Sequence, residues 1–179
     1  MKFIKTIKLI SAATVCCAVL CTPVSGQDKN QLSDAEVAFV AVTANQIDIN
    51  YAVIAKQKSK NAEVIKFAET MQRDHKAVIA QAAALAKKLG VTPKDNAVSK
   101  QLLADAEKTK KTLNAASAKS FDKTYVDNEV AYHKAVIAAV EGLLIPETEN
   151  AELKALLTGV VPALQAHLHH AEMLQKQIK

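Results

Sequence analysis

Apolar residues recur at alternating steps of four and three along several stretches of this chain, which is the pattern of helices that bury one face. The clearest stretch covers residues 61–89, where Asn61 is a suitable N-terminal cap and Gly90 is a typical residue after a helix C-terminus. Its apolar seam consists of Val64, Ala68, Met71, His75, Val78, Ala82, Leu85 and Leu89. The stretch therefore predicts a long amphipathic helix with His75 at the middle of its buried face.

A second long helix is expected before this one, and two more after it. Ser33 is a credible cap for a helix over residues 34–57. The short segment 58–60 predicts a tight reversal, which makes the first two helices antiparallel neighbours. Ser120 is expected to cap a third long helix over residues 121–144.

The last long helix is expected to begin at Asn150, after a break in the chain at residues 145–148. Pro162 lies inside this helix and cannot donate a backbone hydrogen bond, so a kink is expected there. The connection 91–119, between the second and third long helices, contains a weaker helical segment over about 98–113. No stretch has the alternation of a β-strand, so the expected fold class is all-α.

The first 26 residues have the pattern of a signal peptide. Lys2, Lys5 and Lys8 form a basic start, an apolar run follows over residues 9–21, and small residues precede a cleavage point after Gly26. Lipidation at Cys21 is an alternative, although Leu20 is bulky at a position where that signal prefers a small residue. We therefore expect an exported protein, periplasmic or associated with the outer membrane, with its mature domain over 27–179.

Cleavage at this point changes the charge and the cysteine content. It removes all three cysteines, so the mature domain has no disulfide. It also leaves 20 basic against 18 acidic residues, a formal charge of +2 in place of +5. This balance gives no reason to expect nucleic-acid binding. No transmembrane span is expected in the mature chain.

Three of the expected helices place a histidine on the apolar seam near the midpoint: His75, His133 and His167. The fourth helix has Asp48 at its own midpoint, on or beside the buried face, and Glu129 lies one turn before His133. Residues at mid-height meet in one layer of a helix bundle, whichever way the helices run. These five residues are therefore the candidate site.

Two interpretations of this cluster stay open. Imidazole and carboxylate groups on facing helices suit a divalent transition metal such as iron, zinc or copper. In the second interpretation, the histidines form a buried polar layer and donate to carboxylates or tyrosine hydroxyls without any ion. Asp74, next to His75, is expected to face solvent or else to orient a ligand. No nucleophile elbow or phosphate-binding loop is present, so an enzyme is the less favoured class.

The chain resembles the bacterial domain-of-unknown-function family 4142. The resemblance covers nearly the whole mature chain and rests on Phe67-Ala68 with Asp74-His75, on Phe121-Asp122 with Tyr125 and His133, and on Pro162 with His167. It implies an exported protein of the ferritin-like superfamily, a four-helix bundle with a long crossover between helices two and three. It does not imply a di-iron centre, because Glu129 and His133 are one residue too far apart for a Glu-x-x-His motif.

The sequence thus predicts an exported ferritin-like bundle with a candidate site for a transition metal, or a polar layer, at its centre. The alternative is a non-catalytic structural or interaction protein of the cell envelope, with an envelope protein or a second copy of the chain as partner. A redox enzyme is a third hypothesis, and it would need an open coordination position on the metal.

Overall fold

The computed structural model describes residues 31–178, and within this range the secondary structure is entirely helical. The predicted signal peptide, residues 1–26, and the start of the predicted mature domain lie outside the described residues. The helices are α1 (Asp34–Lys58), α2 (Ala62–Leu89), α3 (Ala97–Ala115), α4 (Phe121–Ala139), the π-helical turn η1 (Val140–Leu144), the short α5 (Ile145–Glu147) and α6 (Ala151–Gln177).

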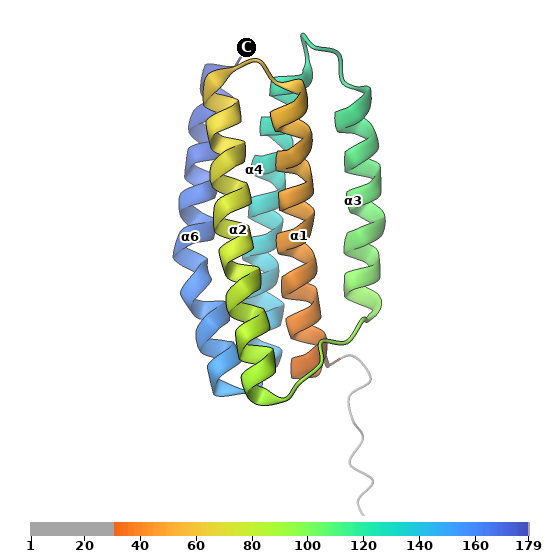
Figure 1. Ribbon diagram of the computed structural model, residues 1–179, viewed down its shortest axis with the longest axis vertical. Helices are drawn as coiled ribbons and strands as arrows, with labels where there is room; N and C mark the ends of the chain where they lie inside the picture. The colour runs from red at the N-terminus through yellow and green to blue at the C-terminus, as the bar shows by residue number, and fades with distance from the viewer. Residues whose placement is uncertain (1–30, 179) are drawn as a thin grey trace, which may run out of the picture.

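The long helices α1, α2, α4 and α6 form a four-helix bundle, and α3 runs along its outside (Figure 1). α1 packs against α2, α2 against α6, α6 against α4, and α4 closes the ring against α1. α3 packs on α1 and returns the chain to the end of the bundle at which α4 begins (Figure 1). The predicted all-α fold, a four-helix bundle with a helical crossover between its second and third long helices, is therefore confirmed. The ferritin-like superfamily assignment stays a prediction.

Most helix ends follow from their capping residues. The side chain of Asn61 accepts hydrogen bonds from the first turn of α2, and that of Asn150 does the same for α6. Gly90 ends α2 in the left-handed conformation, with φ 65°, which glycine adopts at little cost. Ser120 differs from the prediction, because its side chain makes no cap and instead pairs with Ser117 in the preceding turn.

The end of α4 also differs from the prediction. The expected break at residues 145–148 begins only at Thr148, because the chain stays helical through η1 and α5. Pro146 lies just after the π-helical turn and does not interrupt the helix. The π-helical turn places Val140 and Leu144 in the core. Wider turns of this kind are found mostly as single turns within helices, frequently at functional sites.

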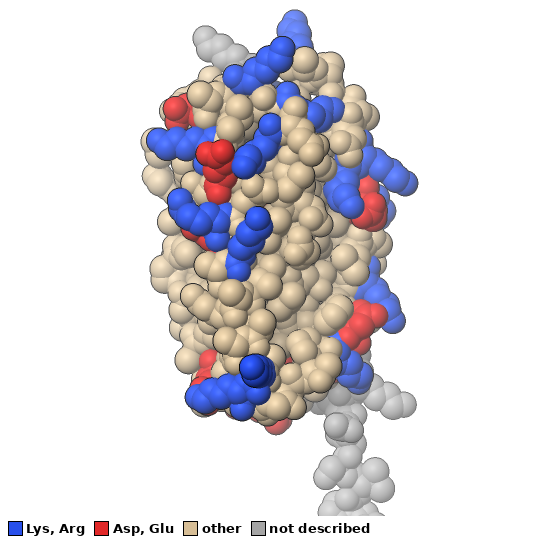
Figure 2. Space-filling view, viewed as in Figure 1, with Lys and Arg blue, Asp and Glu red and all other residues tan. Residues whose placement is uncertain are grey.

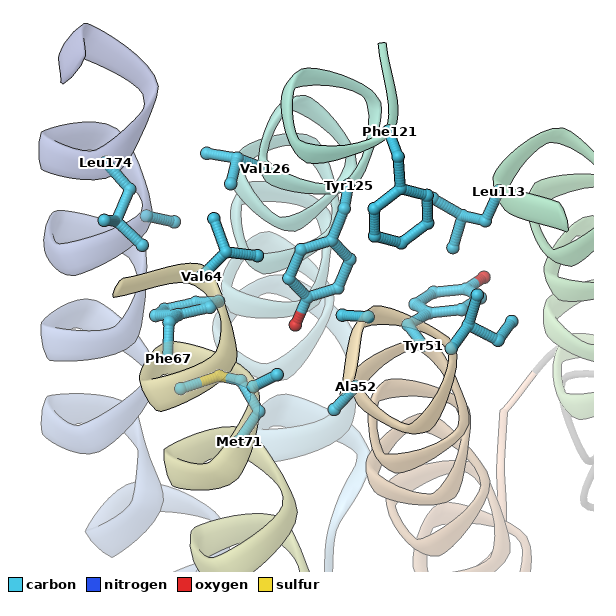
Figure 3. Packing of buried hydrophobic residues seen from close by; sticks show 14 of the residues in the cluster. Tyr51, Ala52, Val64, Phe67, Met71, Leu113, Phe121, Tyr125, Val126 and Leu174 are labelled. Atoms are coloured by element: carbon cyan, nitrogen blue, oxygen red, sulfur yellow. The ribbon is translucent and has the colours of Figure 1, made fainter. Parts of the chain in front are cut away.

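Two clusters of apolar side chains fill the bundle, one toward each end. We call the first the aromatic half, since Tyr51, Phe67, Phe121 and Tyr125 form its centre (Figure 3). The second is the aliphatic half, and its buried members are Val37, Ala38, Val40, Val140, Leu144, Leu153, Leu157 and Leu164. The aromatic half lies at the end of the α1–α2 turn, and the aliphatic half lies at the end at which α6 begins.

Among the described residues, only α1 is long and apolar enough to cross a membrane by length and composition. Of the most apolar 18-residue stretch of α1, 61% is buried within the bundle, so packing in the core accounts for the high hydropathy of this helix. On the face seen in Figure 2, Lys and Arg side chains gather toward the end of the α1–α2 turn, with acidic side chains among them. The middle of this face carries few charges (Figure 2).

Candidate metal centre

The four bundle helices place polar side chains in one layer between the aromatic and aliphatic halves. These side chains are Asp48 from α1, His75 from α2, Glu129 and His133 from α4, and His167 from α6. All five are buried, with exposed fractions between 0% and 8%. The structure thus brings the five residues of the candidate site together in the core.

The three imidazole rings surround a common point. Their centroids are 5.8 Å apart for His75 and His133, 5.3 Å for His75 and His167, and 5.5 Å for His133 and His167. Each ring offers one nitrogen to a group of three atoms that lie within 4.8 Å of one another. Three facing helices therefore direct nitrogen atoms into one small volume.

The protonation of the His75 ring follows from its neighbour Asn45. The side-chain nitrogen of Asn45 donates to the carbonyl oxygen of Ala41 at 2.8 Å, which fixes the orientation of the amide. Its oxygen Oδ1 therefore accepts from Nδ1 of His75, at 2.7 Å. Because the proton is on Nδ1, Nε2 of His75 carries a lone pair, and this buried atom has no hydrogen-bond partner among residues 31–178.

The other two rings are held in the same manner. Nδ1 of His133 donates to the backbone carbonyl of Glu129 at 3.0 Å, which leaves Nε2 as the unprotonated atom. Nε2 of His167 donates to Oδ2 of Asp74 at 3.0 Å, which leaves Nδ1 unprotonated. In the described part of the chain, neither unprotonated nitrogen has a hydrogen-bond partner. Metal-binding histidines characteristically have one ring nitrogen fixed in this way by an outer acceptor.

Asp48 adds a carboxylate to the three nitrogens. Its Oδ2 lies 3.4 Å from Nε2 of His75 and 3.6 Å from Nε2 of His133. Ligand atoms at the corners of a tetrahedron with metal bonds of about 2.0–2.1 Å are separated by roughly 3.4 Å. Both distances agree with this spacing. Neither oxygen of Asp48 has a hydrogen-bond donor within residues 31–178, although the residue is fully buried.

Glu129 lies beside His133. Its Oε2 is 3.5 Å from Nδ1 of His133, the nitrogen that carries the proton. Glu129 also forms a second compact group of potential ligands with Asp48 and His133. The two predicted carboxylates therefore lie near each other but adjoin different nitrogens: Asp48 adjoins the unprotonated nitrogens of His75 and His133, whereas Glu129 adjoins the protonated nitrogen of His133.

Burial favours the neutral form of every group in this layer, because it lowers the pKa of the histidines and raises the pKa of the carboxyl groups. Desolvation, with a smaller effect of neighbouring imidazoles, lowers the pKa of His75 to about 3 and that of His133 to about 4, although the hydrogen bond to the Glu129 carbonyl acts against the shift at His133. Desolvation also raises the pKa of Asp48 to about 8 and that of Glu129 well above its usual range. The imidazoles are thus neutral at physiological pH, as metal ligation requires.

Two further polar residues lie beside the histidines. Asp74, expected either to face solvent or to orient a ligand, is half-buried, accepts from His167 and pairs with the guanidinium of Arg73, at 2.8 Å. Asn45 was not anticipated at all. The available signal was its spacing: Asn45 is three residues before Asp48 on α1 and therefore lies on the same helix face.

The fold and the buried cluster define a class: a helical-bundle protein with a candidate metal centre in its core. The chain belongs to the family described as Domain of unknown function (DUF4142), whose model matches residues 20–174, which confirms the resemblance found in the sequence. A solved structure described as "CopM in the Cu(II)-bound form" has a similar fold, with a TM-score of 0.63 and 17% sequence identity. That likeness covers 83% of this chain and 100% of that one. No curated protein matches.

Proposed function

We propose that this protein binds one divalent transition-metal ion through Nε2 of His75, Nε2 of His133, Nδ1 of His167 and Oδ2 of Asp48. The observation that carries the proposal is the set of three buried, unpartnered imidazole nitrogens that face one another. Buried polar atoms are normally hydrogen-bonded, so three orphaned acceptors in one core layer need a reason. A cation that accepts all three lone pairs supplies one.

Charge balance supports a divalent ion. Asp48 and Glu129 are both fully buried, and their oxygens lack hydrogen-bond donors among the described residues. Two ionised carboxylates in this environment would be costly without a cation. One divalent ion neutralises both, whereas the metal-free protein keeps them neutral by protonation. Glu129 is not a ligand in this proposal. It adjoins the protonated nitrogen of His133 and supplies negative charge near the ion.

The donor atoms narrow the choice of metal. Imidazole suits copper, zinc, iron and nickel, and the predicted mature domain contains no cysteine that would favour a softer ion. For a fixed set of nitrogen and oxygen ligands, copper(II) binds most tightly among the common divalent ions. The Cu(II)-bound protein of similar fold is consistent with this order. We therefore propose copper(II) as the ion of highest affinity and zinc(II) as the nearest competitor.

We further propose an exported protein that holds a metal ion, rather than an enzyme. The four donors come from four helices of one rigid layer, and each imidazole is fixed by its own outer acceptor. Four protein donors suit tight binding, whereas a catalytic zinc centre typically has three protein ligands and a water or substrate in the fourth position. The basic and apolar start of the chain supports export.

The test is the metal content of the mature protein, exported and purified without a histidine tag or chelator. The triple variant His75→Ala, His133→Ala, His167→Ala is compared with His169→Ala, which removes an exposed histidine of α6. We expect about one copper or zinc ion per chain in the wild type and in His169→Ala, and none in the triple variant.

Thermal unfolding supplies a second readout in case the triple variant folds poorly. Copper(II) at about 1,000 times its dissociation constant should stabilise the wild type by roughly 4 kcal/mol. The single variant Asp48→Asn should keep the fold and lose most of this gain. A metal-free wild type that gains no stability from copper, zinc or iron would overturn the proposal in favour of a polar layer.

A further inference from the structure

A cavity of about 290 Å³ extends from the aliphatic half of the bundle to the histidine layer, and residues of α3 line it as well, among them Leu102 and Thr109. Protein interiors contain few voids larger than a water molecule, whereas ligand pockets begin at roughly 300 Å³. On α6 the lining residues run from Leu153 to His167, a length of about 21 Å at a rise of about 1.5 Å per residue. The space is therefore long and of the size of a ligand pocket.

Small side chains explain why the space is open. Alanines face it from all four bundle helices, among them Ala41 on α1, Ala82 on α2, Ala139 on α4 and Ala163 on α6. The aromatic half has Phe67 and Tyr125 at the corresponding depth of the bundle. An aliphatic wall completes the cavity, formed by Val40, Val78, Ile79, Val136, Leu157 and Leu164. A void lined by such side chains takes an apolar occupant more readily than water.

One part of the cavity is polar, because the histidine layer lines it together with Asp48 and Asn45. His75 and His133 line this part, and their exposed fractions are 4% and 1%. The Nε2 atoms of both rings are unpartnered in the described part of the chain, and both carry lone pairs. This part of the cavity thus presents hydrogen-bond acceptors, and it presents a metal ion when one is bound. A ligand that fits has an apolar chain and one oxygen at its tip.

We propose that this cavity binds a single-chain amphiphile, a medium-chain fatty alcohol or fatty acid, with its chain in the aliphatic half and its oxygen at His75 and His133. In the metal-free protein, the O–H of an alcohol or a protonated acid donates to one of the Nε2 atoms. In the metal-loaded protein, the same oxygen lies next to the ion. Binding of the chain does not depend on the metal, so this proposal stands apart from the proposed metal site.

The test measures binding of 1-decanol, decanoic acid and decyl methyl ether to the full mature chain, with and without copper, by calorimetry. The ether has a similar chain and oxygen but cannot donate a hydrogen bond. We expect one decanol per chain in the metal-free protein, and binding of the ether that is weaker by about fivefold to tenfold. Copper should strengthen decanoic acid binding more than decanol binding, because only the acid offers a carboxylate to the ion.

Variants that fill the space provide the control on location. Ala82→Leu and Ala41→Leu each place a larger side chain in the cavity and should weaken binding of all three probes by at least about tenfold. Ala83→Leu, on the exposed side of α2, adds the same atoms outside the cavity and should leave binding unchanged. Copper binding should persist in all three variants, so a failure here is separate from a failure of the metal proposal.

Three results would overturn the proposal. Absence of saturable binding of decanol to wild-type protein would show that the cavity takes no such chain. Equal loss of binding in Ala83→Leu would place the probe elsewhere. Equal affinity for decanol and its methyl ether in the metal-free protein would contradict the position of the oxygen at His75 and His133.

Discussion

The aromatic and aliphatic halves of the bundle are built from the same four helices but are packed in different ways. In the aromatic half, Phe67, Phe121 and Tyr125 are fully buried and contact one another through their ring edges and faces. In the aliphatic half, alanine and valine positions leave a cavity of about 290 Å³. One end of the bundle is therefore closely packed and the other contains a cavity, with the histidine layer between them.

This division has a consequence for the candidate site. Ligands held to a fixed geometry need neighbours that cannot move, and the aromatic half supplies them on one side. Met71 is one turn of α2 before His75 and is fully buried in that half. On the other side, the cavity reaches His75 and His133 directly. The layer is therefore both anchored and approachable by a small apolar molecule.

The largest expected effect is a difference between two truncations of similar chain length. Met71→Ala in the aromatic half should lower the free energy of unfolding by about 3–4 kcal/mol, whereas Leu157→Ala should cost only about 2 kcal/mol. Both side chains are buried, with exposed fractions of 0% and 4%, but Leu157 borders the cavity and has fewer atoms to lose contact with. Denaturant unfolding of the metal-free proteins measures both, and equal costs would contradict the contrast.

The reverse experiment adds volume instead of removing it. Ala68→Leu in the aromatic half should destabilise the protein by about 1–3 kcal/mol, because Ala68 is fully buried among well-packed neighbours. Ala82→Leu, on the same helix, should change the unfolding free energy by less than about 1 kcal/mol, because the cavity accepts the added atoms. Thermal unfolding of both variants is the measurement. A large loss in Ala82→Leu would mean that the space is already filled.

A third prediction concerns the outer partners of the histidines. Asp74→Asn removes the carboxylate that accepts from His167 and should weaken copper(II) binding by about 10- to 100-fold. Asp127→Asn changes a half-buried aspartate of α4 that pairs with Lys123 and Gln175, away from the layer, and should leave the affinity unchanged. Competition with a chelator of known affinity gives both values. Unchanged copper(II) affinity in Asp74→Asn would show that Asp74 does not support metal binding through His167.

The smallest expected effect is a pH dependence of the metal-free protein. Asp48 has a pKa near 8 in the folded state and about 4 when unfolded, so between these values the folded state holds a proton that the unfolded state has lost. The unfolding free energy should therefore fall as the pH rises from 6.5 to 8, by at most about 1.4 kcal/mol per pH unit for this group. Asp48→Asn should reduce this slope. A stability that rises over this interval would contradict the burial of an unpaired carboxyl group.

The acid side of the same profile reports on the histidines. His75 and His133 have folded pKa values near 3 and 4, below the ordinary value of 6.5. Between those values the unfolded state binds protons that the folded state excludes, so each histidine lowers the unfolding free energy as the pH falls from 6.5 toward 4. The triple histidine variant should lose this contribution in the same titration.

Periodicity predicted which face of each helix turns inward, and it did so well. Val64, Ala68 and Met71 are buried as the seam requires, and His75 continues the same seam. The seam beyond His75 behaves differently, since Val78, Ala82 and Leu85 are only half-buried. The spacing of apolar residues assigns each residue to a face of its helix. It does not tell whether side chains of the opposite helices are large enough to fill the space beside that face.

The candidate site shows the same limit. Mid-height positions predicted that His75, His133 and His167 would meet, because layers of a bundle follow from helix length alone. The partners Asn45 and Asp74 depend on rotamers and on the rotation of each helix about its axis, which the spacing along one chain does not determine. The π-helical turn at Val140–Leu144 was likewise missed, since its residues have no composition that separates them from an α-helix.

X-ray absorption spectroscopy of the copper-loaded mature protein tests the proposed metal site. We expect three imidazole nitrogens and one carboxylate oxygen about 2.0–2.1 Å from the ion, with the scattering pattern of the outer ring atoms present in the wild type and absent from the triple histidine variant. A copper environment without imidazole scattering, or an unchanged spectrum in the triple variant, would show that the ion binds elsewhere and would contradict the account.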